Sequence, residues 1–231
     1  MDLELQPPFG RFAAVSKPDD LKYGPPGATA VHLCVDMQRM FAENTDWHMP
    51  WLARILPNII ALSEAHPERT IFTRFIPARQ PGDGAGMWRR YYERWASMTT
   101  SRLGPELTDL VPELIKFIPP AKVFDKHVYS PWTGSNLHEQ LSAAGVDTII
   151  VSGGETDVCV LSTVLGAVDW GFRVILVKDA LCSSTDETHD SMMNIYTNRF
   201  GEQVEAVSTE LLLDSWRIPS SPGSSHVHLA H

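Results

Sequence analysis

The chain has 231 residues, of which 43% are hydrophobic and 20% are charged, and its formal net charge is -9. This composition is typical of a globular protein, and the length suits one α/β domain with a sizeable core. The acidic balance argues against nucleic-acid binding, which needs a basic stripe to neutralise phosphates, and favours small molecules or proteins as partners.

The two ends of the chain differ in composition from the middle. Residues 1–27 are rich in proline and have no sustained period, so they are predicted to form an arm over the fold or over a neighbouring subunit. Residues 218–231 are predicted to be a disordered tail, and residues 28–217 a single domain. The tail histidines His226, His228 and His231 are not expected to bind a metal ion, because ordering the tail costs too much entropy.

Between these ends, short apolar runs alternate with helical patterns. The predicted strands are 30–35, 69–75, 121–124, 147–152, 172–177 and 203–208. The predicted helices are 51–65, 135–145, 158–171 and 186–201, several of them closed by a glycine cap. Strands that are apolar throughout indicate a sheet covered on both faces. The sequence therefore predicts a three-layer α/β/α sandwich with a six-stranded, mainly parallel, Rossmann-like sheet.

Ionisable residues follow three of the predicted strands. Asp36 follows the first, Lys126 and His127 follow the third, and Glu155 and Cys159 follow the fourth. In an open parallel sheet, ligands bind at the carboxyl ends of the strands, where the strand order reverses. The sequence therefore predicts an acid, a cation and a thiol at one edge of the sheet.

The segment SGGETDVCV places Cys159 in the first turn of a predicted helix. There the helix dipole and a nearby ammonium favour the thiolate, so Cys159 is the candidate nucleophile. Gly153 and Gly154 permit a sharp turn before the helix. Thr156 or Asp157 is expected to supply the N-cap oxygen, which leaves free backbone N–H groups to face a developing oxyanion.

Other assignments of catalytic roles stay open at this point. Lys126 could be a solvated lysine, with His127 the base of a Cys-His pair. A Ser-His-Asp triad that uses Ser152 or Ser183 with His189 is disfavoured, because the chain has no GxSxG elbow.

The remaining cysteines have simpler explanations. Cys34 lies in the middle of an apolar strand and is expected to be inert packing. Cys182 lies in the predicted loop after 172–177, where it could line the pocket, while Thr185 or Asp186 caps the next helix. Three cysteines without a CxxC spacing fit neither a disulfide framework nor a zinc site, and they indicate a reducing compartment.

No targeting segment is visible in the sequence. The N-terminus MDLELQPPFGRFAAV begins acidic and lacks the apolar core of a secretory signal, and no apolar run reaches membrane-spanning length. We therefore expect a cytoplasmic protein that does not bind a membrane.

Four segments follow one another along the chain: VDMQ, FDKHVYSPWTGSNLHEQL, VSGGETDVCVLSTVLGAVDWG and LVKDALCSSTDETHD. In this order and spacing, over about residues 29–214, the chain resembles the isochorismatase-like cysteine hydrolases, and in particular their amidohydrolase branch. The resemblance is specific for the fold and the catalytic machinery. It does not specify the substrate.

The resemblance implies a catalytic triad. Asp36 is the general base, Lys126 the cation that holds charge and orients, and Cys159 the nucleophile. It also implies a cis peptide bond between Gly154 and Glu155, with the backbone N–H groups of Glu155 and Cys159 forming the oxyanion hole. The implied reaction is acyl transfer in two steps, in which ammonia or an amine leaves and water then hydrolyses a thioester.

Two features narrow the implied chemistry. The nicotinamidase branch carries a metal-binding DxH after the second strand, whereas this chain has Phe75 and Pro77 in the stretch FTRFIPARQPGDG. Neither residue ligates a metal, so we expect a site without metal or cofactor. The branch that cleaves vinyl ethers often lacks the cysteine, so Cys159 favours C–N hydrolysis.

Glu155 occupies a position where many relatives carry a small or apolar residue. A carboxylate in the pocket would repel acidic substrates and accept hydrogen bonds from N–H groups, which favours a neutral, nitrogen-rich substrate. Alternatively, the side chain points to solvent or to a neighbouring helix. The leading expectation is a small linear amide or ureide, such as a biuret-like or carbamoyl compound. A vinyl-ether hydrolase and a non-catalytic binding protein are the alternatives.

The segment MWRRYYERWASM, residues 87–98, has aromatic residues at helical spacing. It is predicted to be an interface helix of a homo-oligomer, dimer or tetramer, or a lid that walls the pocket and supplies an arginine to the substrate. The glycines in PGDGAG before it would let it move. The residues expected to bind substrate are Glu155, Gln38, Phe41, Tyr129, Trp132, Trp88 and Arg89.

Overall fold

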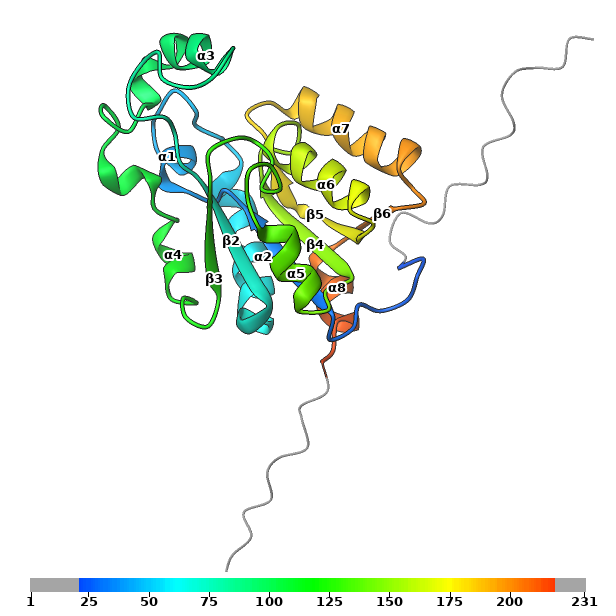
Figure 1. The fold of residues 1–231 in the computed structure, drawn as a ribbon. Coiled ribbons are helices and arrows are strands. Elements are labelled where there is room, and N and C mark those ends of the chain that lie inside the picture. The colour runs from blue at the N-terminus through cyan, green and yellow to red at the C-terminus, as the bar shows by residue number, and fades with distance from the viewer. Residues whose placement is uncertain (1–20, 219–231) are drawn as a thin grey trace, which may run out of the picture.

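The computed structural model describes residues 21–218. The tail histidines and most of the predicted arm lie outside these residues. The strands of the described chain are β1 (Ala30–Val35), β2 (Thr70–Phe75), β3 (Lys122–Lys126), β4 (Thr148–Gly154), β5 (Arg173–Cys182) and β6 (Val204–Val207). They form one sheet in the order β3-β2-β1-β4-β5-β6, and every pair is parallel (Figure 1). This doubly wound order confirms the predicted Rossmann-like sheet, and it reverses between β1 and β4.

Helices cover both faces of the sheet, as Figure 1 shows. One face carries α1 (Arg39–Ala42), α2 (Leu52–Ala65), α4 (Pro112–Ile115) and α8 (Thr209–Ser215). The other face carries α5 (Leu137–Ala143), α6 (Cys159–Asp169) and α7 (Asp186–Arg199). The short helix α3 (Trp88–Arg94) lies beyond the carboxyl edge of the strands, at the top of Figure 1. Three 3₁₀ helices complete the structure, at Pro67–Arg69, Ala96–Met98 and Pro105–Thr108.

Strand β1 shows how the two cores arise. All six of its residues are buried, because strands and helices surround it on every side. Side chains alternate between the faces of a strand, so Ala30 and Cys34 pack toward α2, while Leu33 and Val35 pack toward α6. Each fully buried apolar side chain contributes roughly 1.5–3 kcal/mol to folding. Cys34 is thus a buried residue that packs in the core, as predicted.

Strand β5 is longer than predicted. The register of β4 against β5 shifts between Val151 and Gly153, and beyond the shift Leu181 and Cys182 pair with Gly153 and Gly154. The predicted loop around Cys182 is therefore wrong up to that residue, because the backbone keeps pairing with β4.

The helices α1, α4 and α8 were not predicted. None of the helices in residues 21–218 is both long and apolar enough to cross a membrane.

Candidate active site

Three strand ends bring an acid, a cation and a thiol together. Asp36 follows β1, Lys126 ends β3, and Cys159 is the first residue of α6, which follows β4. The Lys126 Nζ lies 2.6 Å from the Asp36 Oδ2 and 3.4 Å from the Cys159 Sγ. The three residues expose only 1%, 4% and 6% of their surfaces, respectively, so their charges act on one another with little screening by water.

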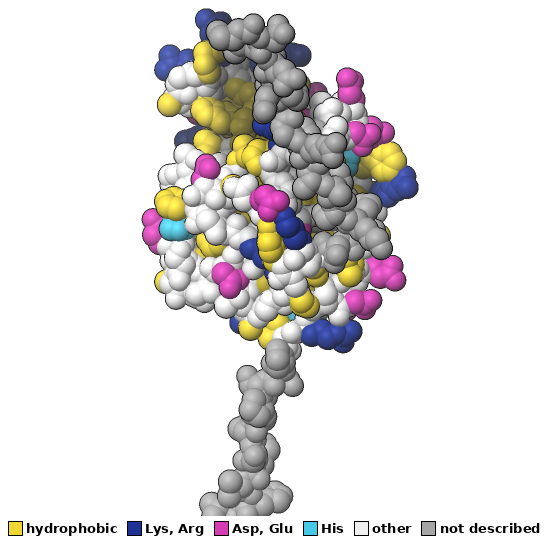
Figure 2. All heavy atoms as spheres, turned by 90° about the vertical axis from the view of Figure 1, so that its right-hand side faces the viewer, with side chains coloured by type: hydrophobic (Ala, Val, Ile, Leu, Met, Phe, Trp, Pro, Cys, Tyr) yellow, Lys and Arg dark blue, Asp and Glu magenta, His cyan; other side chains and the backbone are white. Residues whose placement is uncertain are grey.

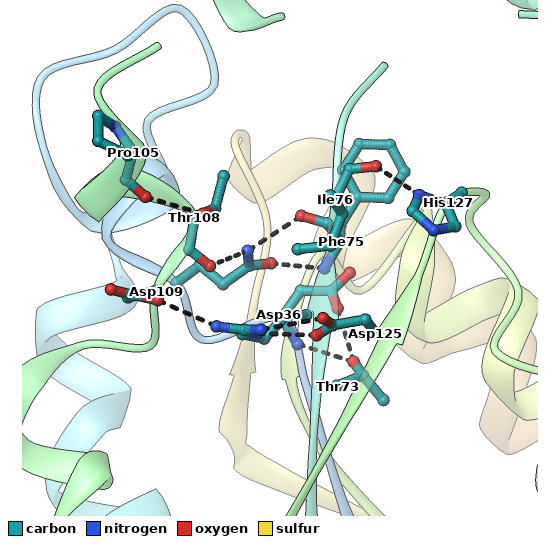
Figure 3. Close-up of polar contacts among 11 residues, drawn as sticks. Asp36, Thr73, Phe75, Ile76, Pro105, Thr108, Asp109, Asp125 and His127 are labelled. Carbon is teal, nitrogen blue, oxygen red and sulfur yellow. Dashed lines mark hydrogen bonds and ion pairs between the residues drawn. The ribbon is translucent and has the colours of Figure 1, made fainter. Parts of the chain in front are cut away.

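Thr73 of β2 fixes the position of Asp36. The Thr73 hydroxyl donates to the Asp36 Oδ1 at 2.6 Å and accepts from the Asp36 backbone N–H at 3.1 Å. Figure 3 shows the two side chains facing each other at neighbouring strand ends. Asp36 has a φ of +50°, in the left-handed region that aspartate tolerates better than most residues. The strand ends there, and the carboxylate turns toward Lys126.

Lys126 is held by more than its ion pair with Asp36. Its Nζ donates to the Val128 carbonyl oxygen at 3.3 Å and lies 5.0 Å from the centroid of the Phe75 ring. Burial acts to lower the pKa of Lys126, but the neighbouring Asp36 carboxylate, together with the hydrogen bond to the Cys159 sulfur, outweighs burial and raises it. The ammonium form is therefore the stable one at this site.

The surroundings of Cys159 favour the protonated form of its thiol. Burial raises its pKa well above the usual range, and the Asp36 carboxylate raises it further, although Lys126 acts to lower it. This result corrects the expectation of a thiolate stabilised by the helix start, because the loss of hydration outweighs the dipole and the ammonium. A neutral thiol beside a carboxylate needs that carboxylate to take its proton as it attacks.

The raised pKa predicts a distinct pH dependence of thiol reactivity. Only the thiolate reacts with iodoacetamide, and its fraction grows about tenfold per pH unit below the pKa. We expect the alkylation rate of Cys159, followed by peptide mass spectrometry, to rise continuously from pH 6 to pH 9. A plateau reached below pH 8 would contradict a protonated resting thiol, and alkylation of the unfolded chain provides the reference profile.

The turn between β4 and α6 presents backbone donors to the thiol. The peptide bond between Gly154 and Glu155 is cis, which confirms the expectation from the resemblance. The Glu155 carbonyl accepts from the N–H groups of Val158 and Val160. Within residues 21–218, the N–H groups of Glu155 and Cys159 donate to no other protein group, so they are available to an oxyanion.

The predicted side-chain cap of α6 is absent. The N-cap residue is Val158, and no side chain accepts a hydrogen bond there. The Thr156 hydroxyl instead donates to the Cys182 carbonyl at 3.1 Å, and Asp157 accepts from Ser183 at 2.5 Å. Both side chains tie the turn to the end of β5. The predicted cap of α7 is confirmed, since Thr185 accepts from the Thr188 N–H.

A cavity of about 310 Å³ opens above Cys159. Its polar lining residues include Asp46, His48, Glu155 and Ser184. Its wall contains six aromatic side chains, from Phe41, Trp47, Phe75, Tyr91, Trp95 and Tyr129. Burial raises the pKa of Glu155, which the Ser184 hydrogen bond partly offsets, so the carboxyl lies in a poorly hydrated place. Glu155 thus lines the cavity and is partly exposed.

Some predicted substrate-binding residues lie outside this cavity, whereas Glu155, Phe41 and Tyr129 do line it. The Gln38 amide donates to the carbonyls of Phe75 and Thr108 and accepts from the Phe75 N–H, so it joins backbone segments. The Trp132 indole donates to the Thr163 carbonyl and stacks on Phe172. The polar groups of these two side chains are therefore hydrogen-bonded to the protein backbone and do not face the cavity.

Trp88 and Arg89 of α3 also lie outside the lining. The Trp88 ring packs 4.9 Å from the ring of Tyr129, and Arg89 is exposed. The cavity instead receives Tyr91 and Trp95 from the same segment. Residues 87–98 thus contribute to the cavity wall through Tyr91 and Trp95, whereas Trp88 and Arg89, which were expected to bind substrate, do not line it.

Asp46, Trp47 and His48 line the cavity but were not predicted to do so. They lie in the connection between α1 and α2, which has neither a helical nor a strand period. A tryptophan between two ionisable residues in a connection that follows the β1 end was the one clue available.

The alternative catalytic assignments do not assemble. His127 is exposed, and its ring nitrogen contacts the Ile76 carbonyl at 3.1 Å rather than Cys159 (Figure 3). Ser152 is buried against His32, with 2.7 Å between the hydroxyl and the ring nitrogen. His189 contacts Thr156 at 2.9 Å and has no contact with a serine. Neither the Cys-His pair nor the serine triad is formed.

Cys182 is buried beside Met49, with 4.0 Å between the two sulfur atoms. It borders a second cavity of about 260 Å³ and not the cavity above Cys159. Within residues 21–218, no three His, Cys, Asp or Glu side chains gather closely enough to hold a metal ion.

Known proteins share this sequence and fold. A family model described as the isochorismatase domain matches residues 30–208. The chain is 32% identical over 80 residues to an uncharacterised isochorismatase family protein, PncA, of Bacillus subtilis (strain 168), which covers 35% of this chain and 44% of that protein. The match thus spans less than half of that relative's length.

Two further proteins match over more of their length. A probable inactive nicotinamidase of Arabidopsis thaliana is 27% identical over 164 residues, which covers 68% of this chain and 82% of that protein. The solved structure of N-carbamoylsarcosine amidase from Thermoplasma acidophilum has a TM-score of 0.63 at 22% identity, and covers 78% of this chain and 96% of that chain. The family model spans most of the described chain, and the site lies at the reversal point of the sheet. The chain therefore belongs to the isochorismatase family.

Proposed function

We propose that this chain is a cysteine-dependent hydrolase that cleaves the C–N bond of a small linear amide or ureide through a thioester. The observation that carries the proposal is the contact of one buried ammonium, on Lys126, with both the Asp36 carboxylate and the Cys159 sulfur at the base of the cavity. Such a cluster is costly to bury, and it supplies a base, a fixed positive charge and a nucleophile within reach of one carbonyl.

The proposed first step forms a thioester. Asp36 takes the proton from the Cys159 Sγ as the sulfur attacks the carbonyl carbon. The oxyanion accepts hydrogen bonds from the N–H groups of Glu155 and Cys159. Asp36 then gives its proton to the leaving nitrogen, the C–N bond breaks, and ammonia or an amine departs. Lys126 keeps the Asp36 carboxylate oriented throughout.

The second step restores the enzyme. Water gives a proton to Asp36 and attacks the thioester carbonyl, and the C–S bond breaks. The sulfur leaves as a thiolate and recovers its proton from Asp36, so the thiol and the carboxylate return to their resting forms. The product is a carboxylic acid from an amide, or a carbamic acid from a ureide.

The cavity supports an uncharged reacting group. The Glu155 carboxyl stands in the wall beside Cys159, where it can accept hydrogen bonds from amide or ureido N–H groups. A ureide offers more N–H groups than a simple amide, which is why biuret-like and carbamoyl compounds lead the proposal. The name of the related N-carbamoylsarcosine amidase describes an enzyme for such a compound.

Removal of the Glu155 side chain should separate binding from thiol chemistry. In Glu155→Ala, the Glu155 backbone N–H remains, whereas the acceptor for substrate N–H groups is lost. We expect kcat/KM for amides and ureides to fall about tenfold, which corresponds to about 1.4 kcal/mol, mainly through KM. The alkylation rate of Cys159 should change much less, and equal losses in both measurements would contradict a binding role.

The test of the proposed function is ammonia release from a panel of carboxamides and ureides, measured for the wild type beside Cys159→Ser. Release that falls to background in the variant, together with an acyl adduct on Cys159 trapped by rapid acid quench of the wild type, would support thiol-dependent hydrolysis. Release that persists without the thiol would overturn it. If neither protein releases ammonia, a vinyl-ether hydrolase or a non-catalytic protein would be favoured. One relative is named as probably inactive.

A further inference from the structure

The wall of the cavity is unusual in its charges. Its ionisable residues include the carboxylates Asp46 and Glu155, and no lysine or arginine lines it. None of the ion pairs within residues 21–218 involves either carboxylate. Asp46 is exposed and accepts a hydrogen bond from the Ser97 hydroxyl. Among residues 21–218, the lining of the cavity therefore carries two carboxyl groups and no lysine or arginine beside them.

Trp47 lies at the centre of the aromatic wall. Its ring centroid is 6.1 Å from that of Phe41, 5.9 Å from those of Phe75 and Tyr91, and 6.4 Å from that of Trp95. These rings come from separate segments of the chain, and those of Phe75 and Trp95 are steeply inclined to Trp47, so the rings pack as a cluster instead of forming one stack. Rings arranged in this way attract cations through their negative faces.

The arginines of α3 lie outside this wall. Figure 2 shows hydrophobic side chains gathered at the upper end of the molecule, where α3 lies, with Lys and Arg side chains at their outer edge. Arg89, Arg90 and Arg94 are exposed, and the Arg94 guanidinium carbon lies 4.9 Å from the centroid of the Trp95 ring. One ring of the wall thus already holds a cation on one of its faces.

We propose that the cavity selects amides or ureides whose far end carries a positively charged nitrogen, such as an alkylammonium or trimethylammonium group. The inference rests on the proposed function for the reacting end and adds the charge of the other end. The amide group lies at Glu155 and Cys159, while the cation lies among Trp47, Tyr91 and Trp95 with Asp46 beside it. An anionic far end meets two carboxylates and no cation in the wall, and is disfavoured.

The experiment compares compounds of one shape and different charge. Trimethylglycinamide and its tert-butyl isostere, in which carbon replaces the charged nitrogen, are matched, and the same pair is lengthened by two methylene groups. The amide with a terminal carboxylate completes each series. Calorimetry on the full chain carrying Cys159→Ser measures binding without turnover. We expect the cation to bind about tenfold more tightly than its isostere, and the anion most weakly.

Two variants locate the effect. In the Cys159→Ser background, Trp47→Leu and Asp46→Asn should each reduce the ratio of the two dissociation constants, and Asn still accepts from Ser97. Glu139→Gln, which removes one exposed carboxylate from α5 away from the cavity, should leave the ratio as it is. Equal binding of cation and isostere, stronger binding of either other compound, or no binding of any compound overturns the proposal.

Hydrolysis rates of the wild type distinguish a failure of the proposed charge selectivity from a failure of the proposed function. Hydrolysis of the neutral or anionic amides at rates equal to the cationic one would overturn the selectivity and leave thiol-dependent hydrolysis standing. A cation preference in calorimetry without any hydrolysis would support the selectivity and contradict the proposed chemistry.

Discussion

Asp36→Asn is expected to lower kcat/KM for the best amide by about 10²–10⁴, because the general base that takes the Cys159 proton is lost. Asparagine is isosteric, tolerates the positive φ, and can still accept from Thr73, so the site keeps its shape. The same change leaves the Lys126 ammonium buried without its partner carboxylate. Breaking a buried pair in this way costs about 3–5 kcal/mol, so the free energy of unfolding should fall by that amount.

A double variant separates the two effects of Asp36→Asn. Lys126→Met removes the unpaired charge and fills similar space, so Asp36→Asn with Lys126→Met should recover much of the lost stability in urea denaturation. Turnover should not recover, since neither the base nor the fixed charge returns. Recovery of activity with stability would show that Asp36 serves only to neutralise Lys126, and full activity of the single variant would remove Asp36 from the mechanism.

Gly153→Ala should be the most destabilising change to a single small residue near the site. Gly153 has a φ of +101°, and an added Cβ would lie 2.1 Å from the Val35 carbonyl oxygen. The neighbouring atoms are backbone atoms of β1, which cannot move aside without parting the two central strands. Strain and collision together should lower the free energy of unfolding by about 4 kcal/mol or more, or the melting temperature by roughly 10 °C.

Gly145→Ala is the matched control for Gly153→Ala. Gly145 also has a positive φ, of +69°, but an added Cβ there would meet nothing within 4 Å. Gly145→Ala should therefore lower the free energy of unfolding by about 1 kcal/mol, which is the penalty of the left-handed conformation alone. Similar losses in both variants would show that the close approach of β1 to Gly153 is tolerated.

The fold could be predicted from the sequence because its strands are short and apolar throughout. The prediction of β1 matches the observed Ala30–Val35, since a buried central strand has no ambiguous flank. The extension of β5 to Cys182 could not be foreseen, because it depends on a register shift against β4 that leaves no mark in composition. The four-residue helices α1 and α4 are too short to show a helical period.

Some residues of the candidate site could be predicted from the sequence, and others could not. Asp36, Lys126 and Cys159 could be predicted to lie together because they stand at or shortly after strand ends, and the carboxyl ends of parallel strands converge. The cavity wall was identified only in part. Gln38 and Trp132 look like pocket residues in sequence but satisfy their polar atoms internally, whereas Trp47 reaches the pocket from an irregular connection. Tertiary contacts of loops decide such positions, and local patterns do not encode them.

The burial of Cys159 also bears on how long the protein survives in an oxidising cell. Peroxide attacks thiolates and hardly attacks thiols, so a sulfur that stays protonated until a substrate arrives is a poor target for sulfenic and sulfinic acid formation. The raised pKa and the small exposure of Cys159 therefore protect the nucleophile between turnovers. Resistance to inactivation by peroxide, greater than that of an exposed low-pKa cysteine, is a consequence of the same packing that delays ionisation of the thiol.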